Sequence, residues 1–137
     1  MAETITDFFD RISGSRKPRF RAEPWYNRDG DCIHYHWRPD DHYGDWIDDK
    51  LTLYRSIDTK EAVGCQIKGV TALIKKLGDF GISLKAQDGT PLALFLFASQ
   101  TIATGSQLPP EDRERTYRYL IEQVAKQKVE FEPSIKV

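Results

Sequence analysis

The chain has 137 residues, of which 39% are hydrophobic and 30% are charged, and its formal net charge is −1. This length suits one domain with a single hydrophobic core. The composition excludes a globally disordered chain, and the balanced charge excludes a strong overall field toward nucleic acid or an anionic membrane.

Two features of the sequence bear on its compartment. The two cysteines, Cys32 and Cys65, are too few for a secreted disulfide scaffold. The first residues are acidic and amphipathic, so we expect no secretory leader, and the longest apolar run, residues 92–98, is far shorter than the ~20 residues of a membrane span. We therefore expect a cytoplasmic protein with reduced thiols and no membrane contact.

The N-terminal part predicts one helix and a basic segment. The helix is indicated by Ile5, Phe8, Phe9 and Ile12, which follow the spacing of a one-sided helix. Four cations then surround Pro18: Arg16, Lys17, Arg19 and Arg21. They could neutralise phosphates of a nucleic acid, or form a solvated linker that balances the acidic loop after it. Because the domain as a whole is not basic, we favour the linker and expect no nucleic-acid partner.

From residue 25 to residue 70 the hydrophobic period changes to two. Ile33, Tyr35 and Trp37 fall on one side of a predicted strand, with Cys32, His34 and His36 on the other. Residues 50–57 and 62–68 predict two further strands, and Gly64 indicates a bulge or a close backbone approach. The turns at residues 27–30 and 58–60 favour an antiparallel β-meander, with residues 38–49 as an acidic loop.

The second half predicts a middle helix, a hairpin and a C-terminal helix. Val70, Leu73, Ile74 and Leu77 mark the short middle helix. Residues 82–86 and 91–97 predict the hairpin, and because residues 92–97 are apolar without alternation, we predict a central strand that is covered on both sides. Prolines followed by acids predict a helix over residues 109–126, and residues 128–131 predict an edge strand.

These elements together predict one α+β domain over residues 1–137. Its core is a mainly antiparallel β-meander sheet, accompanied by an N-terminal helix, a short middle helix and a C-terminal helix. So few helices would leave part of the sheet exposed, and exposed apolar patches commonly mark association surfaces. We therefore expect a homodimer through the sheet.

One candidate site contains Cys32, His34 and His36. Alternate residues of a strand lie ~6.6 Å apart, so these side chains could converge on one ion, with His42 or an aspartate completing the set. Thiolate, imidazole and carboxylate are zinc ligands, and an open position would suit hydrolysis by a metal-bound water. In the alternative interpretation, the histidines are amphipathic spacers and Cys32 is a small hydrophobe.

The other reactive residues form no recognisable catalytic pattern. Ser56 and Ser83 lack a nucleophile elbow, and Cys65 lies on the apolar side of its strand, where thiols are usually inert. The sequence thus identifies no catalytic residue. We expect no cofactor, with zinc held by Cys32, His34, His36 and His42 as the alternative.

Two segments resemble a known family. Residues 26–35 run from an aromatic residue through an acidic, glycine-containing turn into an apolar strand, and residues 57–67 form an acidic turn followed by an apolar-Gly-x-x-Ile strand. Residues 25–70 thereby resemble a small bacterial family known as domain of unknown function 2283. The resemblance implies a small β-rich core and assigns no catalytic residue.

From these patterns we expect a non-enzymatic binding or assembly module. We expect it to self-associate, with a possible protein partner, as an accessory to a larger bacterial system. The alternative is a metal-binding protein or metal-dependent hydrolase that uses Cys32, His34, His36 and His42.

Overall fold

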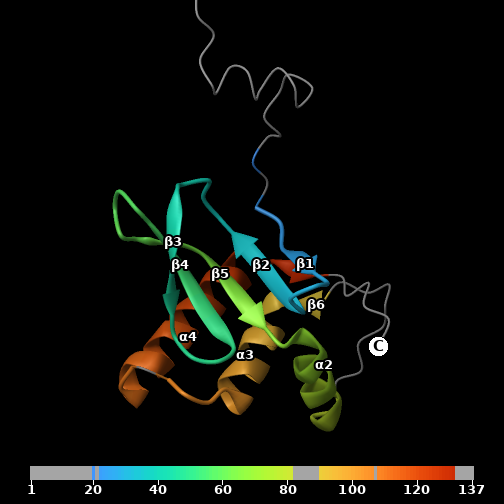
Figure 1. Ribbon diagram of the computed structural model, residues 1–137. Helices are drawn as coiled ribbons and strands as arrows, with labels where there is room; N and C mark the ends of the chain where they lie inside the picture. The colour runs from blue at the N-terminus through green and yellow to red at the C-terminus, as the bar shows by residue number, and fades with distance from the viewer. Residues whose placement is uncertain (1–19, 21, 82–89, 107, 132–137) are drawn as a thin grey trace, which may run out of the picture.

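The computed structural model describes residues 20, 22–81, 90–106 and 108–131 (Figure 1). The strands form a five-stranded sheet in the order β1-β2-β5-β4-β3 and a separate β6-β7 pair. The strands are β1 (Trp25–Asn27), β2 (Cys32–His36), β3 (His42–Trp46), β4 (Leu51–Ser56), β5 (Ala62–Lys68), β6 (Thr90–Pro91) and β7 (Glu130–Phe131). The helices are α2 (Val70–Asp79), α3 (Leu92–Ile102) and α4 (Pro110–Lys126). Three predicted segments lie outside the described residues. They are the N-terminal helix, the basic residues Arg16, Lys17, Arg19 and Arg21, and the strand at residues 82–86.

The predicted α+β class and antiparallel sheet are confirmed, but the strand order is not that of a simple meander. Strands β3, β4 and β5 follow one another as a meander, and β5 then pairs with β2. The connection after β2 therefore carries the chain to the far edge of the sheet before it returns. This order places β5 at the centre, where Val63, Cys65 and Ile67 are fully buried.

The prediction that residues 38–49 form only a loop is wrong, because residues 42–46 form strand β3. This strand pairs with β4, with Asp45 opposite Leu53. It lies at the edge of the sheet, where polar and charged side chains remain in solvent. The hydrogen bonds between β3 and β4 join backbone groups and do not require apolar side chains. The composition of residues 42–46 therefore did not indicate a strand.

The prediction of a central strand over residues 92–97 is also wrong, because these residues begin helix α3. Leucine, alanine and glutamine favour helix, and no β-branched residue precedes Thr101 in this segment. Leu92, Phe95, Leu96 and Ser99 are fully buried at helical spacing. The segment is apolar almost all round because α3 packs between α2, α4 and strand β5. The homodimer expectation therefore loses the strand on which it partly depended.

The middle and C-terminal helices are confirmed. Helix α4 buries Tyr117, Leu120 and Val124, and α2 buries its own apolar stripe. The start of α2 is held by Asp31 in the β1–β2 turn, whose carboxylate accepts hydrogen bonds from the backbone and hydroxyl of Thr71. Among the described helices, none is long and apolar enough to cross a membrane.

A buried carboxylate joins the sheet to the helices. Asp48 has no exposed surface. One of its oxygens accepts hydrogen bonds from the backbone N–H groups of Lys50 and Leu51, at 2.9 and 2.8 Å. The other accepts from Arg113 Nε at 3.1 Å and from the Tyr117 hydroxyl at 2.8 Å, both on α4. Burial, together with Asp48, raises the pKa of Tyr117, so its hydroxyl remains a donor.

We expect Asp48→Ala to lower the free energy of unfolding by about 3–5 kcal/mol, because it leaves the Arg113 charge and several polar groups without their partner. Urea unfolding measures this loss. The matched control is Glu114→Ala on the same helix, which removes an exposed pair with Arg118 and should change stability by less than about 0.5 kcal/mol. Equal losses in the two variants would contradict the role of Asp48.

Candidate functional site on the open face of the sheet

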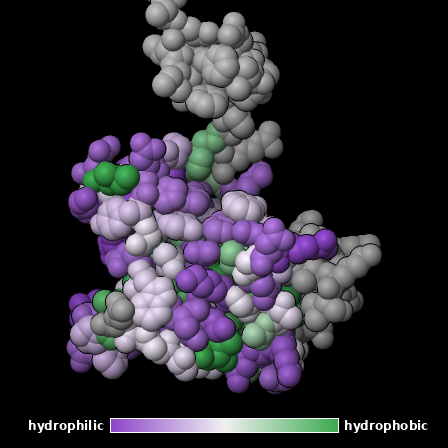
Figure 2. Space-filling model, viewed as in Figure 1, coloured by the Kyte–Doolittle hydropathy of each residue, from purple (hydrophilic) through white to green (hydrophobic). Residues whose placement is uncertain are grey.

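The three described helices lie behind one face of the sheet (Figure 1). We call the opposite side the open face. As predicted, Ile33 and Tyr35 of β2 point into the core, whereas His34 and His36 are only partly buried. The register adds further open-face residues from the neighbouring strands: Trp25, Gln66, Gly64, Thr52, Tyr54, His42 and Trp46. Figure 2 shows this face as mostly hydrophilic to neutral, with only small hydrophobic patches.

Five rings from four strands contact one another on the open face, and we call them the ring cluster. Trp25 stacks on His34, with ring centroids 4.4 Å apart and an interplanar angle of 16°. Tyr54 stacks on His36 at 4.7 Å and 11°. His42 is tilted against both His36 and Tyr54, at 4.6 and 4.7 Å. The sheet register thus assembles residues that are up to 29 positions apart in sequence, from Trp25 to Tyr54.

Gly64 explains how rings from non-adjacent strands meet. It lies opposite His36 on one side and Tyr54 on the other. A Cβ atom at this position would lie 2.6 Å from the Tyr35 carbonyl oxygen and 2.8 Å from the His36 ring. Without a side chain on β5, the two flanking rings can lean together above it. The predicted close backbone approach is confirmed, and the β4–β5 register also shifts beside this residue.

The structure divides the predicted metal ligands into two pairs. Cys32 Sγ lies 3.3 Å from His34 Nε2, and the other nitrogen of that ring shares a 3.1 Å hydrogen bond with the Tyr54 hydroxyl. His36 pairs with His42 through ring contact. Among the residues that the structure describes, no group of three or more histidine, cysteine or acidic residues could hold a metal ion. The zinc alternative stays a prediction.

Burial keeps two histidines neutral. It lowers the pKa of His36 to about 4, with smaller contributions from His42 and His34. It also lowers the pKa of His34. His36 Nε2 is buried and has no hydrogen-bond partner among the described residues. The centre of the open face is therefore built from neutral rings at neutral pH.

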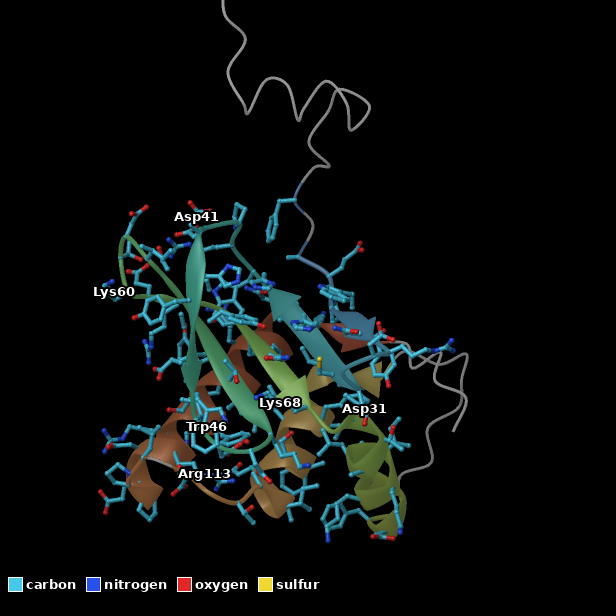
Figure 3. The ribbon with its side chains drawn as sticks, viewed as in Figure 1. Asp31, Asp41, Trp46, Lys60, Lys68 and Arg113 are labelled. Atoms are coloured by element: carbon cyan, nitrogen blue, oxygen red, sulfur yellow. The ribbon has the colours of Figure 1, made fainter. Side chains whose placement is uncertain are left out.

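A hollow of about 390 Å³ lies at one end of the open face. This is the upper end in Figure 3, where Asp41 is labelled. Among the residues that the structure describes, its lining combines aromatic rings, two carboxylates and one guanidinium: Phe20, Glu23, Trp25, His36, Arg38, Pro39, Asp40 and His42. The ring cluster forms part of its wall.

A second hollow of about 660 Å³ lies between the sheet and α4, lined by Trp37, Arg38, Leu53, Arg55, Glu61, Ala62, Arg115, Thr116 and Tyr119. Its arginines already have carboxylate partners. Arg38 pairs with Asp40 and Glu61, Arg55 with Asp45, and Arg115 with Asp112. An anion here would have to compete with these pairs, so this hollow is the weaker candidate.

Sequence reasoning found the histidines and missed their neighbours. Trp25 and Tyr54 were not among the predicted site residues, although alternation from the buried Leu51 and Leu53 places Tyr54 outward. Trp25 and Tyr54 lie next to the histidines only because of the strand order, and no local sequence pattern predicts that order. The predicted nucleic-acid residues, Arg16, Lys17, Arg19 and Arg21, lie outside the described residues.

Comparisons with known proteins leave this chain without a match. No protein-family model matches it, and neither curated proteins nor solved structures gave a match. The resemblance of residues 25–70 to domain of unknown function 2283 therefore stays a prediction.

The neutral histidines predict a pH-dependent stability. His36 takes up a proton near pH 6.5 when unfolded but only near pH 4 when folded. Between these values the unfolded chain binds more protons, so the free energy of unfolding should fall as the pH is lowered and be fully restored above 6.5. His36→Gln should remove about 1 to 2 kcal/mol of this loss, since the partly exposed ring is screened by solvent.

Urea unfolding at a series of pH values measures this difference. Asp40 supplies the internal control, because its hydrogen bond with Arg38 lowers its pKa below the ordinary 3.8. Its contribution is lost only as the pH falls through that lower pKa, and it should persist in the variant. An unchanged slope between pH 6.5 and 4 in His36→Gln would exclude His36 as the source.

The zinc alternative makes a separate prediction. If the cluster binds zinc, replacing His34 and His36 together by alanine should abolish uptake without unfolding the domain. Native mass spectrometry of protein purified without a histidine tag or chelator counts the bound ions. Zinc binding that survives the double substitution would assign the metal to other residues.

Proposed function

We propose that this chain is a non-enzymatic binding or assembly module that self-associates through the open face. The observation that carries the proposal is the one-sided covering of the sheet by α2, α3 and α4 within the described residues (Figure 1). The uncovered side presents Trp25 and Trp46, whose side chains are 53% and 36% exposed. Tryptophan and tyrosine are enriched in the centres of protein interfaces.

The polar groups on the open face favour recognition over reaction. The ring nitrogens of His34 are engaged by Cys32 and Tyr54. Burial raises the pKa of Tyr54 to about 12. On the opposite side, burial raises the pKa of the Cys65 thiol to about 12, which suppresses the reactive thiolate. Both cysteines are free, which supports our proposal of a reducing, cytoplasmic setting.

The proposal predicts a dimer that depends on the open face. We expect native mass spectrometry and light scattering to find a dimer in the full chain, and Trp46→Glu to shift it to monomer, because it would bury a charge at the interface. The thermal midpoint should change little, since Trp46 lies on the edge strand β3.

Tyr119→Glu is the matched control. Its side chain is 47% exposed on α4, on the helical side of the molecule, so the dimer should persist in this variant. A monomer at every concentration, or equal loss of dimer in both variants, would refute self-association through the open face.

A further inference from the structure

We propose that the hollow at the upper end of the open face binds an alkylated ammonium group, carried either by a small organic cation or by a methylated side chain of a partner protein. The inference rests on the binding role in the proposed function and not on self-association, because this hollow opens on the same face. The inference specifies the chemical nature of the group that this face binds.

The walls of the hollow supply aromatic rings from separate segments. Phe20 precedes β1, and Trp25, His36 and His42 come from β1, β2 and β3. Phe20 is 43% exposed. One face of the Trp25 ring stacks on His34, and the residue is 53% exposed, so a ligand can approach the other face of the ring. A cation over a tryptophan or phenylalanine face is attracted by the ring quadrupole.

The charges of the described residues around the hollow favour a cation over an anion. Among these residues, the lining contains the carboxylates of Glu23 and Asp40 and one guanidinium, that of Arg38. Arg38 is already bonded to Asp40 through Nε and Nη2, and to Glu61 through Nη1. Within the described part of the chain, Glu23 has no ion pair. The His36 ring adds no positive charge at neutral pH, because burial lowers its pKa to about 4.

The same lining selects the kind of cation. Calcium and magnesium require six or more oxygen ligands, whereas the described lining offers the carboxylates of Glu23 and Asp40 beside several aromatic rings. A compact ammonium ion is strongly hydrated. An alkylated ammonium group carries apolar surface around its charge, so aromatic rings can replace its water while a carboxylate balances the charge.

The test titrates the full chain with choline chloride and with 3,3-dimethylbutan-1-ol, which has the shape of choline without its charge. Calorimetry should show saturable binding of choline and roughly tenfold weaker binding of the alcohol. A trimethyllysine peptide forms the second arm. Tighter binding of this peptide assigns the group to a partner protein, and equal or weaker binding assigns it to a free cation. Failure of both cations to bind, or equal binding of the neutral alcohol, would overturn the proposal.

Variants locate the binding in the hollow. Trp25→Ala should weaken choline binding roughly tenfold, and Glu23→Gln, which keeps the shape of the side chain, roughly threefold. Phe97→Ala is the matched control, because Phe97 is 49% exposed on helix α3 and does not line the hollow, so this variant should leave the affinity unchanged. Unchanged affinity in both hollow variants would refute the assignment.

The outcomes separate this inference from self-association. Trp46→Glu is directed at the dimer and not at the hollow. Choline binding by a chain that is monomeric at all concentrations would retain the hollow and reject self-association. A dimer that binds neither cation would do the reverse.

Discussion

The fold depends on one buried carboxylate. Asp48 lies in the turn between β3 and β4, yet its carboxylate accepts hydrogen bonds from Arg113 and Tyr117 on α4 as well as from Lys50 and Leu51. A buried charge is tolerated only when its partners are in place, so the turn and the helix fix each other's position. The adjacent Asp49 accepts hydrogen bonds from the backbone and hydroxyl of Thr104, which follows α3. Helices α3 and α4 are thereby held to one face of the sheet.

This attachment decides which side of the sheet is available for binding. With the helices behind the sheet, Ile33 and Tyr35 of β2 complete the core while His34 and His36 remain on the open face. The central position of β5 then brings Gly64 between β2 and β4. A missing side chain at the centre of the sheet lets rings from its two neighbours meet. The same strands thus supply the core packing on the helical side of the sheet and the ring contacts on the open face.

Strand order also changed the meaning of the predicted metal cluster. On β2 alone, Cys32, His34 and His36 look equivalent, because they alternate along one side. In the sheet, His34 lies between Trp25 and Tyr54, and Cys32 contacts the same histidine. His36 turns toward His42 from the far edge. Neighbours from other strands therefore divide the set, and they create an aromatic hollow at one end.

The sequence by itself determined the elements whose period is set by near neighbours. The alternation in β2 and the helical stripes of α2 and α4 could be read directly, because each side chain faces the core or solvent according to local geometry. Only the tertiary structure decided that residues 92–102 form a helix and 42–46 a strand. An apolar run can be buried as either element, and an edge strand is held by backbone bonds to β4. The ring cluster also lay beyond the sequence, because its contacts follow from strand order, which is set by packing between residues far apart in the chain.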